Sequence, residues 1–230
     1  MPAPELVIFD CDGVLVDSEI IAARVEAALI TEAGYPIEPE TIMERYSGLT
    51  VKDMLVAIEQ ESGVPFQASL LDRMREETDR RLAADVRPVE GAARAVAAVR
   101  TPRCVCSNSR PQRIELMLGR TGLLPLFEGH IFSAQDPAVA RPKPAPDVFL
   151  HAAQSMGADP VKTFVIEDTV HGIAGARAAG MRVIGFTGGA HSFPGHADAL
   201  TEAGAETVIR RWAELDATLT ALSQWSENLG

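Results

Sequence analysis

The sequence lacks the features of a membrane protein and of a secreted, disulfide-rich protein. No apolar stretch approaches the roughly 18 residues that a membrane-spanning helix requires. The segment Met1–Pro4 has neither the basic region nor the apolar region of a signal peptide. Only three cysteines occur, and Cys11, Cys104 and Cys106 lack the spacing of a metal-binding pair. We therefore expect a cytoplasmic protein with reduced, buried thiols and no membrane partner.

Positive charge is also in short supply. Lys and Arg number 21 against 32 Asp and Glu, so the formal net charge is −11. An acidic surface repels nucleic acid, which disfavours nucleic-acid binding as a function. A site for an anionic substrate would therefore need its own local positive charge. The five histidines show no metal-site spacing, and we expect the segment 191–196 to be a surface loop.

Hydrophobic periodicity divides the chain into two kinds of region. Residues 18–85 carry apolar residues at helical spacing without any strand-like run, which predicts helices near 18–34, 38–46, 51–62 and 67–84. Strand-like and helical patterns alternate after residue 87. Strands are expected at 5–9, 103–107, 130–133, 163–167, 182–186 and 206–209, and helices at 91–100, 111–121, 146–156, 170–179 and 212–223. This alternation predicts an α/β fold with a Rossmann-like parallel sheet covered on both faces.

The helical block is expected to be an insertion into this α/β core. The first strand has no partner nearby in the sequence, so it must pair with strands far along the chain. Residues 1–16 and 87–230 are therefore expected to form the core, and residues 17–86 an all-helical cap. Pro88 and Gly91 lie in the second crossing between them, where they favour a stiff but bendable hinge.

Two carboxylates follow the first predicted strand. Asp10 comes directly after the apolar run 6–9, and Asp12 stands two residues further on, ahead of Gly13. A carboxylate can attack phosphorus to form an aspartyl-phosphate. A second carboxylate nearby can give a proton to the leaving oxygen and later take one from water. A plain strand-end turn is the competing interpretation of the pair.

Two further groups suited to a phosphate stand near the ends of predicted strands or ahead of predicted helices. Ser107 and Asn108 end the run 103–107, where a hydroxyl and backbone N–H groups suit an anionic oxygen. An ordinary helix N-cap is the alternative interpretation there. Lys143 lies between two prolines, which hold its ammonium group in a stiff loop ahead of a helix. Such a group can neutralise a phosphate before the reaction begins.

Adjacent acids at the end of a buried strand indicate a cation site. Glu167 and Asp168 follow the apolar run 163–166, and burying both would be costly without a cation. Mg²⁺ takes oxygen ligands, commonly one or two carboxylates together with waters and a substrate phosphate. We therefore expect Mg²⁺ to be held by Asp10, Asp168 and the carbonyl of Asp12, with Glu167 bound directly or through water.

These positions together resemble the motifs of the haloacid dehalogenase-like hydrolases over nearly the whole chain. Residues 9–19 look like the first motif of that family, and Ser107, Lys143 and the pair Glu167-Asp168 fall where the other three are expected. The helical insertion resembles the cap of its phosphoglycolate phosphatase and β-phosphoglucomutase branch.

The resemblance implies distinct roles for these residues. Asp10 would be the nucleophile and Asp12 the acid and base, while Ser107 and Lys143 would bind the phosphate and Mg²⁺ would lie near Asp168. The implied partner is a small phosphorylated metabolite.

Within the family, the residues favour hydrolysis. Haloacid dehalogenases replace the second acid of the first motif, whereas this chain keeps Asp12. β-Phosphoglucomutases carry a His and a cap-loop Arg where this chain has Ala22 and Val51. We therefore expect a Mg²⁺-dependent phosphatase acting on sugar phosphate-like monoesters. A β-phosphoglucomutase-like phosphotransferase and a non-catalytic protein that binds a metabolite or a partner protein are the alternatives.

The loop between the second and third predicted helices is the candidate for recognising the leaving group. It contains Gly48 and Thr50 and is flanked by Arg45 and Lys52. An ordinary helix–helix turn is the alternative interpretation. The sequence does not indicate the physiological substrate or the oligomeric state, and a monomer is compatible with it.

Overall fold

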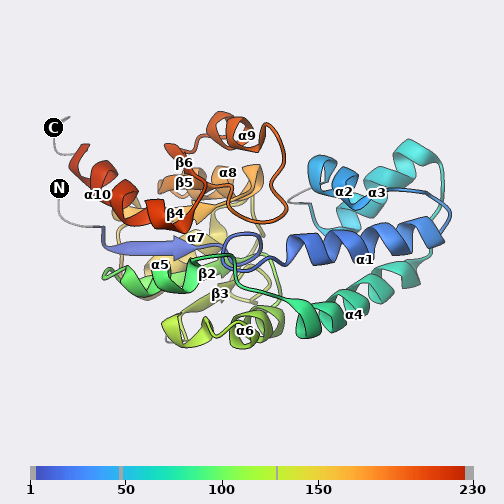
Figure 1. Cartoon of the computed structure of the whole chain (residues 1–230), viewed down its shortest axis with the longest axis horizontal. Helices are drawn as coiled ribbons and strands as arrows, with labels where there is room; N and C mark the ends of the chain where they lie inside the picture. The colour runs from blue at the N-terminus through green and yellow to red at the C-terminus, as the bar shows by residue number, and fades with distance from the viewer. Residues whose placement is uncertain (1–3, 47–48, 128, 226–230) are drawn as a thin grey trace.

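A parallel sheet forms the centre of the computed structural model, which describes residues 4–46, 49–127 and 129–225 (Figure 1). Over these residues the sheet has six strands in the order β3-β2-β1-β4-β5-β6. They are β1 (Leu6–Phe9), β2 (Arg103–Ser107), β3 (Ile131–Ser133), β4 (Thr163–Glu167), β5 (Arg182–Phe186) and β6 (Thr207–Ile209). All neighbouring pairs are parallel, so the strands end at one edge. The expected Rossmann-like α/β fold is confirmed, with the strand order of doubly wound sheets.

The alternation of side chains along each strand places an apolar core on both faces of the sheet. In β1, Val7 and Phe9 belong to one buried cluster, and Leu6 and Ile8 belong to the other. The first cluster is covered by α5 (Ala92–Ala98), α6 (Pro111–Arg120) and α10 (Leu215–Trp225). The second is covered by α7 (Asp147–Met156), α8 (Val170–Ala178) and α9 (His196–Glu202). Burial on both faces explains why all the residues of β1 are apolar.

Four helices lie beyond the carboxyl ends of the strands, to the right of the β1 arrow in Figure 1. They are α1 (Glu19–Glu32), α2 (Pro39–Arg45), α3 (Val51–Ser62) and α4 (Ala68–Asp85), and their ends agree with the expected ranges to within two residues. Their own core contains Ile30, Ile58 and Met74, all nearly inaccessible to solvent. No helix in the described ranges, not even the 18-residue α4, is apolar enough at sufficient length to cross a membrane.

The two crossings between the helical block and the sheet run side by side. The Asp17 N–H donates to the Arg87 carbonyl at 3.0 Å, and the Val89 N–H donates to the Leu15 carbonyl at 3.0 Å. Val16 and Pro88 form an antiparallel bridge between them. These contacts support the division of the chain at residues 17 and 87, which stays a prediction of the sequence.

The structure corrects the expectation of a surface loop at residues 191–196. His191 and His196 are buried, with exposed fractions of 5% and 6%, and α9 begins at His196 where no helix was expected. The expected helix at 212–223 is also divided, because a 3-10 turn at Trp212–Glu214 precedes α10. The misassignment arose because polar and glycine residues around 187–195 resemble an exposed loop, although the segment packs against the sheet edge.

Candidate active site

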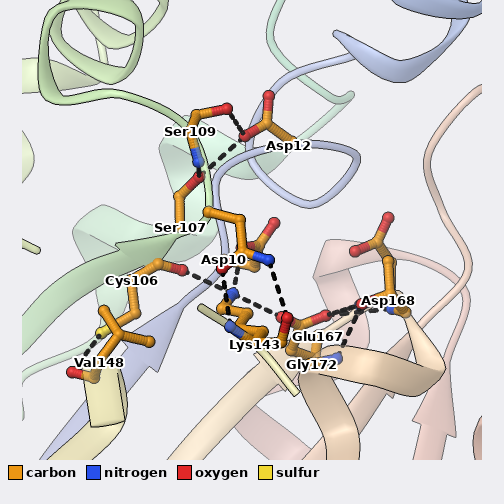
Figure 2. Close-up of polar contacts among 12 residues, drawn as sticks. Asp10, Asp12, Cys106, Ser107, Ser109, Lys143, Val148, Glu167, Asp168 and Gly172 are labelled. Atoms are coloured by element: carbon orange, nitrogen blue, oxygen red, sulfur yellow. Dashed lines mark hydrogen bonds and ion pairs between the residues drawn. The ribbon is translucent and has the colours of Figure 1, made fainter. Parts of the chain in front are cut away.

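The predicted site residues from three neighbouring strands meet at the carboxyl edge of the sheet (Figure 2). Asp10 follows β1, Ser107 ends β2 and Glu167 ends β4. The strand order reverses between β1 and β4, and in open α/β sheets ligands bind in the crevice at such a point. Asp10, Lys143 and Glu167 are all buried there, with exposed fractions of 6%, 6% and 1%.

Lys143 joins the carboxylates that follow two different strands. Its ammonium Nζ lies 2.5 Å from Oδ1 of Asp10 and 2.6 Å from Oε1 of Glu167. It also donates to the Cys106 carbonyl at 2.8 Å. Burial alone would lower the pKa of Lys143, but the two carboxylates outweigh it and raise the pKa above its ordinary value. The group is therefore a permanently charged cation held at the point where the sequence predicted a phosphate contact.

For the pKa of Asp10, burial outweighs the nearby opposite charge. Burial raises the pKa of Asp10 well above its ordinary value, Lys143 opposes this, and the carboxylates of Glu167, Asp168 and Asp12 add to it. Four acids therefore share one corner with a single buried ammonium group. A divalent cation bound in this corner would favour the ionised form of Asp10.

Both carboxylate oxygens of Glu167 contact other groups of the protein. Its Oε1 faces Lys143, while its Oε2 accepts from the Asp168 N–H at 3.0 Å, the Thr169 N–H at 3.1 Å and the Thr169 hydroxyl at 3.0 Å. Any Cβ at position 172 would lie 1.8 Å from Oε1, so Gly172 leaves the room that this carboxylate occupies. Each oxygen therefore already contacts the protein, but a carboxylate oxygen has two lone pairs, so the expected metal contact, direct or through water, stays a prediction. Glu167 also anchors Lys143.

Asp168 has the properties of a metal ligand. Its side chain is inaccessible to solvent, yet neither carboxylate oxygen accepts a hydrogen bond from the residues that the structure describes. Oδ2 lies 2.8 Å from Nε2 of His191, an ion-pair contact that is not aligned as a hydrogen bond. A buried carboxylate with unsatisfied oxygens is costly unless a ligand completes it.

The residues at this corner fit Mg²⁺ better than a metal that needs many protein side chains. In the described parts of the chain, no group of three or more His, Cys, Asp or Glu side chains is arranged around a metal position. Mg²⁺ keeps several waters and needs only one or two carboxylates beside a phosphate oxygen. Asp10 and Asp168, with the Asp12 carbonyl, match that requirement.

Asp12 is held by three hydroxyl groups from two parts of the chain. Ser18 donates to its Oδ1 at 2.8 Å, and Ser107 and Ser109 donate to its Oδ2 at 3.0 and 2.9 Å. The Ser107 hydroxyl therefore touches Asp12 in this structure, so a contact with phosphate would require it to change partner. Ser18 lies within the motif segment 9–19 and Ser109 lies two residues after Ser107, but the sequence assigned neither residue a role at the site.

Asn108 positions Lys143. Its Oδ1 accepts from the Lys143 N–H at 2.9 Å, and its Nδ2 donates to the Lys143 carbonyl at 3.3 Å. This two-sided contact fixes the backbone of the proline-rich loop against the end of β2. The amide is thus engaged with the protein, and the phosphate contacts expected of Asn108 and Lys143 stay predictions.

The loop after β5 is the part of the site that sequence analysis missed. His191 contacts Asp168 as described above, and Nε2 of His196 lies 2.7 Å from the Asp168 carbonyl. Burial alone would lower the pKa of His191, but Asp168, with smaller contributions from Glu19 and Asp17, raises it to about 9. The imidazole is therefore a cation packed against the carboxylate.

The same loop touches both the first motif and the hinge. The Ala190 N–H donates to Oδ1 of Asp17 at 2.7 Å. Gly13 has a positive φ of 75°, and a Cβ there would lie 2.1 Å from Oδ2 of Asp168. Only glycine therefore allows this turn to approach Asp168 so closely.

A cleft of about 580 Å³ separates the sheet edge from the helical block. Its sheet side contains Asp10, Asp12, Ser107 and Lys143, and its helical side contains residues of α1, α3 and α4. A larger groove of about 1090 Å³ runs along α1 and α4, but none of the predicted site residues lines it. The smaller cleft is therefore the candidate active site.

The predicted cap residues divide into two groups. Thr50 and Lys52 line the cleft, and Thr50 also caps α3 by accepting from the Asp53 N–H at 3.1 Å. Arg45 does not line the cleft and pairs with Glu61 at 2.7 Å, and its assignment to leaving-group recognition stays a prediction. Gly48 lies outside the described residues.

Comparison with known proteins gives matches over most of the chain. A family model described as haloacid dehalogenase-like hydrolase matches residues 4–180. The 6-phosphogluconate phosphatase of Escherichia coli is 31% identical over 191 residues, which cover 83% of this chain and 86% of that protein.

Solved structures match the fold closely. A conserved haloacid dehalogenase-like protein of unknown function from Agrobacterium tumefaciens is 54% identical, with a TM-score of 0.91 over 96% of this chain and 100% of that one. A hydrolase of the same family from Deinococcus radiodurans, with bound phosphate and sodium, is 34% identical. Its TM-score is 0.80 over 95% of this chain and 96% of that one.

Proposed function

The chain belongs to the haloacid dehalogenase-like hydrolases, and on this basis we propose a Mg²⁺-dependent phosphatase that works through an aspartyl-phosphate. The family and its phosphatase relatives identify the protein as a phosphoric monoester hydrolase acting on phosphorylated small molecules. The proposed substrates are monoesters similar to sugar phosphates, because the Escherichia coli relative is named for such a compound.

One observation carries the proposal. Asp10 and Asp12 stand at the carboxyl end of β1, and the buried Lys143 ammonium, which lines the same cleft, lies 2.5 Å from Asp10. A nucleophile, a proton carrier and a fixed positive charge therefore surround one position. That combination suits a phosphoryl group, whose transfer depends mainly on positioning and charge stabilisation.

The first chemical step breaks the bond between phosphorus and the leaving-group oxygen. An oxygen of Asp10 attacks phosphorus and forms the aspartyl-phosphate. Asp12 gives a proton to the departing oxygen, so that the leaving group departs as an alcohol. Lys143 stays charged throughout and neutralises the phosphoryl oxygens. Asp10, Asp168 and the Asp12 carbonyl would hold Mg²⁺, which would supply additional charge neutralisation.

The second step returns the enzyme to its starting state. Asp12, now ionised, takes a proton from water, whose oxygen attacks phosphorus and releases inorganic phosphate from Asp10. Ser18 and Ser109 hold Asp12 in its orientation, while Ser107 is free to change partner from Asp12 to a phosphoryl oxygen.

The cleft supports hydrolysis over the mutase alternative. Ala22 and Val51, which stand where β-phosphoglucomutases carry a His and an Arg, both line the cleft. Neither side chain can bind the second phosphate of a bisphosphate intermediate. Water is therefore the proposed acceptor.

An acid-quench experiment with an aryl phosphate tests the mechanism. The leaving group of such an ester needs no proton, so Asp12→Ala should still form the aspartyl-phosphate but release phosphate slowly. Mass spectrometry of the peptide containing Asp10 should then show one added phosphoryl group. Phosphate release by the wild type should require Mg²⁺. Rapid turnover by Asp12→Ala would contradict the assignment, and the absence of turnover by the wild type on any phosphomonoester would contradict the proposed function.

A further inference from the structure

The side of the cleft formed by α1 carries two acidic residues that the mechanism does not use. Glu19 and Glu26 both line the cleft, with Ala22 and Ala23 between them. The spacing of seven residues is close to two helical turns, so both glutamates lie on the same side of α1. The alanines between them leave a shallow surface where a ligand can lie against the helix.

Glu26 is the more unusual of the two. Its exposed fraction is 9%, and it makes no hydrogen bond or ion pair with any residue in the described ranges. Burial raises the pKa of Glu26 to about 7, and Arg113 opposes the rise. Arg113 itself is engaged elsewhere, because its Nε donates to Asp79 at 2.7 Å. The Glu26 carboxylate faces the cleft without a donor from the described residues, so water or a ligand must supply its hydrogen bonds.

The position of Glu26 along α1 places it next to a part of the substrate that the catalytic groups do not contact. Ser18, which precedes the helix, touches Asp12 at 2.8 Å. Glu26 lies eight residues further along, or about 12 Å at the usual helical rise. A phosphoryl group at Asp10 is therefore remote from Glu26, and only a leaving group several atoms long would reach it.

The Glu26 side chain accepts hydrogen bonds when ionised and both donates and accepts when protonated, so its partner must carry donors together with acceptors. Hydroxyl groups meet this requirement, whereas an alkyl chain or a second phosphate does not. We propose that Glu26 is a specificity residue that accepts hydrogen bonds from the hydroxyl groups of a long, polyhydroxylated leaving group. The proposal rests on the proposed phosphatase function and assigns the far end of the substrate to α1.

The test compares two substrates of similar length that differ in hydroxyl groups. A hexitol phosphate and n-hexyl phosphate are hydrolysed by the wild type, Glu26→Ala and Glu26→Gln, and kcat/KM is measured for each. The readout is the ratio of kcat/KM for the hexitol ester to that for the hexyl ester. In the wild type this ratio should be well above one.

Glu26→Ala should lower the ratio by about 10- to 100-fold, the usual effect of losing hydrogen bonds to a charged group. Glu26→Gln should lower it less, because the amide oxygen still accepts a hydrogen bond. Glu44→Ala is the matched control, since Glu44 is exposed on α2 and outside the cleft. Its ratio should equal that of the wild type.

A structural role for Glu26 would give a different pattern. Glu26→Ala would then lower kcat/KM for both esters by the same factor, and the unchanged ratio would overturn the proposal. Glu26→Leu, which keeps the side-chain volume without an acceptor, distinguishes the two roles if the alanine variant folds poorly, because only a hydroxyl-binding role lowers its ratio. Hydrolysis of neither ester nor any other phosphomonoester by the wild type would instead overturn the phosphatase function itself.

Discussion

The sheet edge and the α1–α4 side of the cleft differ in how their charged groups are held. At the sheet edge, Lys143 and Glu167 form contacts between segments far apart in the sequence, and each is almost fully buried. Across the cleft, Lys52 is exposed and Glu26 has no partner among the described residues. The difference indicates that the groups proposed for bond cleavage are already positioned by the fold. The groups proposed to face the leaving group lack protein partners and are available to bind a ligand.

The largest expected effect follows from removing the proposed nucleophile, Asp10. Asp10→Asn keeps the shape of the side chain but cannot form a stable acyl-phosphate, so turnover should fall by about ten-thousand-fold or more. Steady-state phosphate release measures the effect, and a circular dichroism spectrum like that of the wild type shows that the fold persists. Activity within tenfold of the wild type would remove Asp10 from the mechanism.

The next effect concerns stability and compares one cation from each side of the cleft. Lys143→Met leaves Asp10 and Glu167 as buried acids without a counter-charge, which should lower the free energy of unfolding by about 3–5 kcal/mol. Urea denaturation measures this loss. Lys52→Met, at an exposed position, should leave the unfolding midpoint unchanged. Equal midpoints for the two variants would show that the sheet edge is not held by its ion pairs.

A third prediction tests the loop that sequence analysis missed. His191→Gln removes a cation 2.8 Å from the Asp168 carboxylate, so Mg²⁺ binding should strengthen by about tenfold, because the imidazolium no longer competes for this ligand. Calorimetric titration of the substrate-free protein with Mg²⁺ measures this directly. His151→Gln is the matched control, because His151 packs against Phe132 far from the carboxylates. Unchanged Mg²⁺ affinity in His191→Gln would mean that the contact only packs the loop.

The smallest effect lies in the helical block. Thr50→Ala removes the N-cap contact to the Asp53 N–H and should destabilise the protein by about 1 kcal/mol. Thermal unfolding measures the change, and Thr50→Ser should restore most of it because the hydroxyl is retained. A loss as large as that of Lys143→Met would show that α3 is coupled to the sheet more tightly than its contacts indicate.

The parts of the site that follow buried strands could be predicted from the sequence. Asp10, Ser107 and Glu167 each end or follow an apolar run, and parallel strands bring such positions to one edge. The prolines around Lys143 identified a stiff loop, and the structure adds that Asn108 holds it. Such signals are local in the sequence, so they need no knowledge of distant contacts.

The remaining features depend on contacts that no local pattern reveals. His191 and Asp168 are distant in sequence, and their contact arises only when the loop after β5 packs against the Gly13 turn. Arg45 and Lys52 are both basic residues that flank the same predicted loop. In the structure, however, Arg45 pairs with Glu61 while Lys52 lines the cleft. Which face of a short helix meets a cleft is decided by packing between helices.

The paired crossings between the sheet and the helical block make the block exchangeable. Because the Asp17 N–H bonds to the Arg87 carbonyl, the chain leaves the sheet and re-enters it at adjacent points. A shorter turn or a helical block of another shape could therefore be joined at these two residues without stretching the strands. Evolution or protein engineering can therefore replace the helical block at this single attachment point, while the residues at the sheet edge stay in place.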